Sequence, residues 1–398
     1  MSLNATPSGS RLHIGFFGLR NAGKSSLVNA VTGQNLSLVS DVKGTTTDPV
    51  KKAMELLPLG PVVIIDTPGL DDEGELGKMR VQRAKEMLSS ADIAVLVTAA
   101  DAPLSALEEA LLADFEARKL PYIIAKNKAD LLSHLPEAGE KELFVSALTG
   151  LHIQELKERL GQFVKQDEKV LVADLLSPGD LVVLVCPIDE SAPKGRIILP
   201  QQMTLREILD SHASALVCQP EELKGIMDTF GSKVKLVVTD SQVFGKVAKD
   251  VPKDVPLTSF SILMARYKGD LAAVIRGAAM LDKLQNGDKV LISEGCTHHR
   301  QCKDIGTVKL PGWIRDYCQK EVEFTFTSGG EFPEDLSGFA LIVHCGGCML
   351  NEAEMKSRLA KSQRQSVPMT NYGIAIARIH GILKRSVEPF PAIAEILG

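Results

Sequence analysis

The octapeptide GLRNAGKS, at residues 18–25, constrains the fold of this chain more than any other stretch. It matches the pattern G-x-x-x-x-G-K-[ST] in full, and it lies between the apolar run LHIGFFG and the helical pattern GKSSLVNAVTG. A glycine-rich turn between a strand and a helix surrounds phosphate oxygens with backbone N–H groups, and the helix N-terminus adds positive potential. The motif predicts a nucleoside triphosphate site in which Lys24 reaches the β- and γ-phosphates and Ser25 binds Mg²⁺. The residues expected around the phosphates are Gly18, Asn21, Ala22, Gly23, Lys24, Ser25 and Ser26.

Four further motifs follow in order and indicate which base the site accepts. DTPG supplies Gly69 and Asp66, and the Asp66 carboxylate can hold the ligand shell of Mg²⁺. KGTTTDP matches a switch I pattern, in which Thr46 is the expected Mg²⁺ ligand. NKAD supplies Asp130, which can accept two hydrogen bonds from guanine. Adenine offers no such pair of donors, so the pattern predicts GTP and GDP as ligands. The residues expected around the base, which include the SAL motif, are Asn127, Lys128, Asp130, Ser146, Ala147 and Leu148.

This run of motifs resembles the translation-factor-like GTPases, and more narrowly their TrmE–Era branch. Leu70 stands where a resemblance to Ras would place a water-positioning glutamine, and an apolar side chain cannot orient water. Asn21 occupies the place of an asparagine that ligates K⁺ in TrmE-like members. The resemblance therefore implies slow, K⁺-stimulated GTP hydrolysis, with K⁺ in place of an arginine finger, although Asn21 could instead only brace the loop. Thr47 replaces an arginine that often follows the switch I threonine, so no role carries over to it. The residues carried over as catalytic are Lys24, Thr46, Asp66 and Gly69.

The 398 residues are too many for one ordinary core, and they alternate between apolar and amphipathic segments. This alternation predicts an α/β protein of three domains, each built on a mostly parallel sheet flanked by helices. The first domain is expected at residues 8–168. The second, at 178–266, follows a break at Pro178 and Gly179 and contains the expected strands LVVLVCPI, ALVCQ, VKLVVTD and TSFSILM. The third, at 267–398, contains the expected strands DKVLISEG, VEFTFTS and FALIVHC between the long helices GDLAAVIRGAAMLDKLQ and NYGIAIARIHGILKR.

Two segments of the third domain carry cysteine and histidine directly after an apolar run. EGCTHH contains Cys296, His298 and His299, and HCGGC contains His344, Cys345 and Cys348. The carboxyl ends of parallel strands lie at one edge of a sheet, so the thiols of both segments can meet there. Asn351 and Glu354 resemble a capping box, and a helix N-terminus near Cys348 would favour its thiolate. Three thiolates with an open fourth position suit a [4Fe–4S] cluster, but zinc takes the same donors, and the chemistry alone leaves the two metals level.

The pattern C-x-H followed by H-C-x-x-C, behind a GTPase domain, resembles the [FeFe]-hydrogenase maturation GTPases, the HydF family, over essentially the whole chain. This resemblance favours iron–sulfur and carries over Cys296, Cys345 and Cys348 as cluster ligands, with His298 and His344 as motif members. It leaves open whether His298 or His344 binds iron, and Asp304 or water could take the fourth position instead. It also implies a homodimer joined through the middle domain and a third domain that binds the cluster. The implied role is that of a GTP-hydrolysing scaffold that carries a two-iron precursor cluster, with radical-SAM maturases and apo-[FeFe]-hydrogenase as partners.

Two alternative functions belong to other classes. A tRNA- or ribosome-associated GTPase with a zinc-binding C-terminal domain would share the first motifs, but the net charge of −5 and the absence of a basic stripe disfavour nucleic acid as a partner. A redox enzyme is disfavoured because no flavin or dinucleotide fingerprint occurs.

No apolar run approaches a membrane span and no signal peptide is recognisable, so the sequence predicts a cytoplasmic protein. The residues expected to pack or to lie away from the metal are Cys186, Cys218, Cys302, Cys318 and Trp313.

Overall fold

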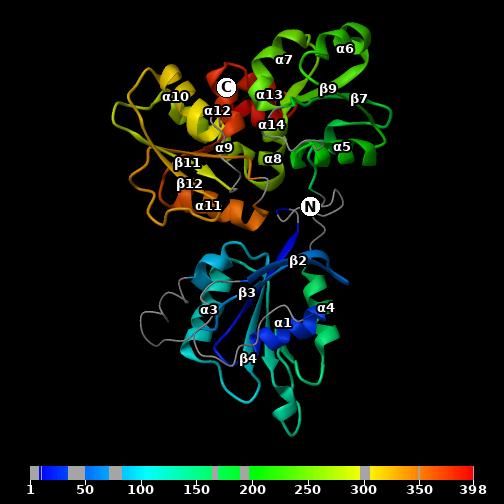
Figure 1. The fold of residues 1–398 in the computed structure, drawn as a ribbon, viewed down its shortest axis with the longest axis vertical. Coiled ribbons are helices and arrows are strands. Elements are labelled where there is room, and N and C mark those ends of the chain that lie inside the picture. The colour runs from blue at the N-terminus through cyan, green and yellow to red at the C-terminus, as the bar shows by residue number, and fades with distance from the viewer. Residues whose placement is uncertain are drawn as a thin grey trace. The chain divides into compact units, whose positions relative to one another are not determined.

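The computed structural model describes Gly9 and residues 11–34, 50–70, 83–163, 169–188, 197–295, 305–347 and 350–397. The chain forms two compact units, Met1–Asp167 and Glu168–Gly398 (Figure 1). Each unit is built on parallel β-structure with helices packed against it, which confirms the predicted multi-domain α/β class. The finer division of residues 168–398 into two domains stays a prediction.

The first unit holds a six-stranded sheet in the order β2-β3-β1-β4-β5-β6, in which only the β2–β3 pair is antiparallel among the described strands. Its strands are β1 (Leu12–Phe17), β2 (Val50–Leu56), β3 (Gly60–Asp66), β4 (Ile93–Ala99), β5 (Tyr122–Asn127) and β6 (Glu142–Phe144), and its helices include α1 (Lys24–Thr32), α3 (Ala106–Ala117) and α4 (Ile153–Gln162). The alternation of a strand directs Ile14 and Phe16 to the core under α1 and α4, and Phe17 to the core under α3. Both faces of the central strands are therefore covered, as a doubly wound sheet requires.

A second, wholly parallel sheet lies in residues 181–259, in the order β10-β9-β7-β8. Its strands are β7 (Leu181–Val185), β8 (Ser214–Cys218), β9 (Val234–Thr239) and β10 (Leu257–Ser259), and the helices between them are α5 (Leu199–Asp210), α6 (Leu223–Phe230) and α7 (Phe244–Asp250). The prediction of one strand over TSFSILM was wrong. The strand stops at Ser259, whose hydroxyl accepts a hydrogen bond from Ile262 N–H at 3.3 Å and so caps helix α8 (Phe260–Lys268).

The third sheet, also parallel, has the order β12-β11-β13-β14. Its strands are β11 (Lys289–Glu294), β12 (Glu323–Ser328), β13 (Leu341–His344) and β14 (Met369–Asn371), and the helices around it are α9 (Leu271–Ala278), α10 (Leu310–Cys318), α11 (Glu352–Arg364), α12 (Tyr372–Ile379), α13 (Leu383–Val387) and α14 (Pro391–Ala394). Both long helices expected here are shorter than predicted. The first gives way to a 3₁₀ turn at Ala279–Asp282, and the last breaks at Gly381, whose φ of 68° is left-handed.

The C-terminal helices return to the second sheet. Ile374 of α12 and Val387 of α13 belong to the same buried cluster as Val182 of β7 (Figure 1). Gly373 permits this approach, because a Cβ atom there would lie 2.2 Å from the Ser261 Cβ atom of α8. The two sheets of residues 168–398 thus share helices and belong to one compact unit.

Candidate nucleotide and metal sites

The turn between β1 and α1 has the geometry expected of a phosphate-binding loop. Gly23 has a φ of 83°, and a Cβ atom at this position would lie 2.3 Å from the Asn127 side-chain nitrogen. Only glycine satisfies both the left-handed backbone and the close approach. Asn21 is also left-handed, with a φ of 67°, and its side chain is exposed at the mouth of the loop. The described conformation therefore leaves Asn21 accessible to solvent.

Lys24, Ser25 and Asp66 meet beneath this loop. The Ser25 hydroxyl donates a hydrogen bond of 3.0 Å to Asp66 Oδ2, and Lys24 Nζ lies 3.8 Å from Asp66 Oδ1. Lys24 is buried, and this burial lowers the pKa of its ammonium group, while the charge of Asp66 opposes the shift. A hydroxyl and a carboxylate this close supply the oxygen ligands that Mg²⁺ prefers.

The base-pocket motifs are joined by Asn127 at the end of β5. Its Nδ2 donates to the carbonyl of Ala22 at 3.0 Å, and its Oδ1 accepts from the N–H of Ala147 at 3.1 Å. The Ser146 hydroxyl donates to Asp130 Oδ1 at 2.5 Å, which holds the carboxylate that was predicted to read guanine. The structure thus brings together the phosphate loop, NKAD and SAL. The adjacent side chain of Leu148 is 86% exposed, and Lys128 has a left-handed φ of 64°.

Leu70 is tied to the phosphate loop through its backbone. Its N–H donates to the carbonyl of Gly18, and its carbonyl accepts from the N–H of Arg20, both at 3.1 Å. The Leu70 side chain is 1% exposed and packs in the core under α3. Gly69 lies against Arg20, since a Cβ atom on Gly69 would stand 2.9 Å from the Arg20 Cα atom. Thr46 and Thr47 lie outside the described residues.

The two cysteine segments end neighbouring strands. β11 and β13 are paired in parallel with Ser293 opposite His344, so both chains leave the sheet at the same edge. Cys345 follows β13 directly, and its Sγ accepts hydrogen bonds from the N–H groups of Gly295 at 3.0 Å and Gly347 at 3.4 Å. Such N–H···S bonds are typical of cluster-ligating thiolates. Four residues of the predicted site lie outside the described part of the chain, namely Cys296, His298, Asp304 and Cys348, as do the neighbouring His299 and Cys302.

The residues present fit a cluster at this edge. The Gly295 N–H contacts Cys345 Sγ, so the residue that precedes Cys296 in the chain lies against one of the three predicted ligands. The described residues hold no group of three or more His, Cys, Asp or Glu side chains able to bind a metal ion, but they include only Cys345 of the predicted thiol ligands.

The helix that follows the cysteine loop is capped at the residue that the sequence indicated. Helix α11 begins at Glu352, and Asn351 is its N-cap, with a side-chain oxygen that accepts a hydrogen bond from the Glu354 N–H at 3.2 Å. The Glu354 carboxylate accepts a hydrogen bond of 2.6 Å from Nη2 of Arg358, one turn further along the helix. The first turn of α11 therefore connects the end of the cysteine loop to a buried cation.

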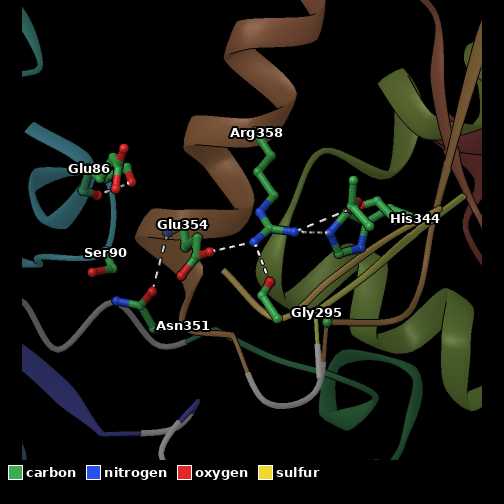
Figure 2. Close-up of polar contacts among 12 residues, drawn as sticks. Glu86, Ser90, Gly295, His344, Asn351, Glu354 and Arg358 are labelled. Carbon is green, nitrogen blue, oxygen red and sulfur yellow. Dashed lines mark hydrogen bonds and ion pairs between the residues drawn. The ribbon is translucent and has the colours of Figure 1, made fainter. Parts of the chain in front are cut away.

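His344 is buried behind this loop, with a partner at each ring nitrogen. Nε2 lies 2.9 Å from Nη1 of Arg358, and Nδ1 lies 2.7 Å from the carbonyl oxygen of Cys345 (Figure 2). Burial, and then the neighbouring Arg358 charge, lowers the pKa of His344 to about 3, so the imidazole is neutral at physiological pH. An arginine can only donate, so Nε2 accepts and Nδ1–H donates to Cys345.

Sequence reasoning missed two buried cations beside the cysteine loop. Lys268, at the end of α8, donates to the carbonyls of Gly347 at 3.1 Å and Leu350 at 2.7 Å. Arg358 lies on α11 and is 3% exposed. No local pattern in the sequence marks Arg358, because its burial beside Leu359 and Ser362 depends on how this helix packs.

The remaining cysteines and Trp313 were expected to lie away from the metal. Cys186 is buried, and burial raises the pKa of its thiol to about 12. Cys218 is only half-buried, and burial raises its pKa to about 11. Cys318 lies at the end of α10, and Trp313 packs edge-on against His380 with ring centroids 5.9 Å apart.

Within the described ranges, no helix has the length and apolar character needed to cross a membrane.

Three family models match successive parts of the chain. Residues 13–128 match the model of the 50S ribosome-binding GTPase, residues 171–269 match the hydrogen maturase F dimerization domain, and residues 272–389 match the hydrogen maturase F tetramerization domain. The first model lies within the first compact unit, and the other two lie within the second.

Individual relatives resemble only part of the chain. GTPase Der of Wolinella succinogenes is 36% identical over 167 residues, which are 38% of this chain and 35% of that protein. The tRNA modification GTPase MnmE of Bordetella avium is 35% identical over 153 residues, 38% of this chain and 33% of that protein. The chain thus spans about a third of the length of these two curated relatives. A solved structure of Era from Aquifex aeolicus is 20% identical, covers 52% of this chain and 93% of that one, and has a TM-score of 0.35.

Proposed function

Because this chain belongs to the HydF family of hydrogen maturases, with a TrmE/Era-like GTPase domain, we propose that it is a GTP-hydrolysing scaffold and carrier. In this proposal it binds a [4Fe–4S] cluster and a two-iron precursor, and it delivers the precursor to apo-[FeFe]-hydrogenase. Radical-SAM maturases are the proposed partners that complete the precursor. The GTPase acts as a switch that changes contacts with partners.

One observation carries the cluster assignment. The Gly295 N–H lies 3.0 Å from Cys345 Sγ, which brings the residue that precedes the C-x-H segment against the first cysteine of the H-C-x-x-C segment. This contact supports Cys296, Cys345 and Cys348 as the thiolate ligands, with His298 and His344 as the other members of the motif. A bound cluster would supply an iron with an accessible coordination position. The chain's own contribution is to hold the thiolates at one sheet edge and to direct N–H groups at sulfur.

The nucleotide site supports GTP as the substrate. We assign guanine recognition to Asp130, whose carboxylate accepts from the Ser146 hydroxyl, and we assign the phosphates and Mg²⁺ to Lys24 and Ser25, which lie beside Asp66. The buried side chain of Leu70 cannot direct a water molecule at the γ-phosphate. We therefore assign slow hydrolysis to this site and K⁺ binding to Asn21, which would bring positive charge to the β- and γ-phosphates.

Self-association is proposed to begin with a homodimer through the region that matches the dimerization model. Strand β8 ends the order of the second sheet, and Val217 on it is 49% exposed, which leaves an apolar strand at an edge. The tetramerization model covers the third sheet and supports pairing of dimers there. The mass of the assembled protein in solution tests this part of the proposal.

Metal analysis after anaerobic purification tests the proposed function. We expect about four iron and four sulfide per chain, whereas a single zinc would favour a ribosome- or tRNA-associated GTPase instead. Cys345→Ser and Cys348→Ser should each lose iron and retain GTP hydrolysis, because the nucleotide site lies in the other compact unit. Cys186→Ser is the matched control and should retain iron. Wild-type iron in both loop variants would contradict the ligand assignment.

A further inference from the structure

Arg358 has hydrogen-bond partners at both of its terminal nitrogens, beside the cysteine loop. Its Nη1 lies 2.9 Å from His344 Nε2 and 3.4 Å from the Ser293 hydroxyl, and its Nη2 donates to Glu354 Oε1 at 2.6 Å (Figure 2). Nη2 also donates to the carbonyl of Gly329 at 2.8 Å. Burying a guanidinium is unfavourable unless its charge and its N–H groups find partners. The Glu354 carboxylate compensates the charge, which leaves Nη1 directed at His344.

The chemistry of these groups fixes how His344 is used. The guanidinium stays protonated and has no acceptor, so the lone pair of Nε2 must point toward Arg358. The proton of the imidazole is then on Nδ1, which donates to the Cys345 carbonyl oxygen at 2.7 Å. A neutral histidine binds a metal through a nitrogen lone pair, and in this arrangement that lone pair is occupied.

We propose that Arg358 is a positioning residue of the cluster site. Its guanidinium holds His344 by Nε2, and this keeps the imidazole from binding iron. The Nδ1–H group of the held imidazole then fixes the carbonyl of Cys345. The proposal rests on the proposed function, because it concerns a cluster bound by the Cys345 loop. It assigns His344 a supporting role within the H-C-x-x-C motif. It also leaves the fourth iron position to a group other than His344.

The test is pulsed electron paramagnetic resonance on the full chain, reconstituted anaerobically with iron and sulfide and then reduced. This method detects the nuclear coupling of a nitrogen bound to the cluster. His344→Gln should retain iron at the wild-type level with an unchanged nitrogen coupling, because a glutamine oxygen can accept the Arg358 hydrogen bond. Arg358→Met frees Nε2 and should add a nitrogen coupling that is absent from the wild type. The double variant Arg358→Met/His344→Gln should lose that added coupling.

Two further variants separate this role from a structural one. Arg358→Lys keeps a cationic donor and should behave as the wild type. Arg385→Met is the matched control, because Arg385 bonds the backbone carbonyls of Ala248 and Val251 in the same compact unit, and its loss should add no coupling. If Arg358→Met fails to fold, His344→Gln still decides, since loss of a wild-type nitrogen coupling there would identify His344 as an iron ligand.

Each outcome bears either on Arg358 or on the cluster itself. A coupling lost in His344→Gln, or no added coupling in a folded Arg358→Met protein, overturns the role of Arg358 and leaves the cluster in place. Absence of iron–sulfur signal from the reconstituted wild type overturns the proposed function and the role of Arg358 together.

Discussion

Asn127→Ala should loosen the junction between the phosphate loop and the SAL segment. The substitution removes the Nδ2 bonds to Ala22 at 3.0 Å and Gly23 at 3.4 Å, and the Oδ1 bond to the N–H of Ala147 at 3.1 Å. Asn127 is 2% exposed, so water does not readily replace these partners. A buried hydrogen bond contributes about 1 kcal/mol, so we expect a loss of about 2–3 kcal/mol from the free energy of unfolding of the first unit. This corresponds to a fall in Tm of roughly 5–10 °C.

Hydrogen exchange of the full chain under increasing urea measures this loss at peptides from β1 and α1. Asn127→Asp keeps the acceptor for Ala147 but puts a buried carboxylate oxygen against the carbonyls of Ala22 and Gly23, so its loss should be at least as large as that of the alanine variant. Gln154→Ala removes only an exposed bond to Glu158 and should change stability by less than about 0.5 kcal/mol. An Asn127→Ala protein within that margin of the wild type would refute the reasoning.

Three further predictions concern single side chains. GTP hydrolysis should be faster in K⁺ than in Na⁺, and Asn21→Ala should remove most of that difference; equal turnover of the wild type in both salts would contradict the K⁺ assignment. Asp130→Asn should weaken GTP binding by about 100-fold and relax the preference over ATP, as equilibrium titration would measure, and unchanged discrimination would remove Asp130 from the base pocket. The thiol of Cys186, with a pKa raised to about 12, should stay protonated at pH 8, so alkylation should be at least ~100-fold slower than for free cysteine until the protein is denatured. Rapid labelling of the native protein at Cys186 would disagree with its burial.

The fold could be predicted from the sequence where the local sequence pattern and the packing in the folded protein require the same residue. The phosphate loop is such a case, because Gly23 is demanded both by its own backbone and by the neighbouring Asn127. The prediction of a strand over TSFSILM was wrong because a short apolar run that is buried on all sides shows neither the helical nor the strand period. Only the capping hydroxyl of Ser259 marks the start of the helix. β2 was missed because VKKAMEL is half polar, as suits the strand at the end of the first sheet.

The candidate metal site divides in the same way. The meeting of the two cysteine segments at one edge follows from parallel strands, and the contact between Gly295 and Cys345 agrees with it. The role of Arg358 could not be predicted from the spacing of residues in the sequence. It depends on the packing of α11, which brings Arg358 next to His344 at the end of β13. Charged residues usually lie at the surface, so a buried arginine is visible only once its partners His344 and Glu354 are in place.

The shared helices of residues 168–398 bear on how such a chain can be rearranged by recombination. A gene fragment that encoded 171–269 alone would omit Ile374 and Val387, and would leave the apolar cluster around Val182 without its cover. Exchange between genes at that boundary would therefore yield proteins prone to aggregate. The boundary near residue 167 has no such obstacle within the described cores, because the cluster around Ile14 is filled from the first unit alone. The first unit can therefore be joined to other sequences without uncovering its core, whereas residues 168–398 must stay together to keep theirs covered.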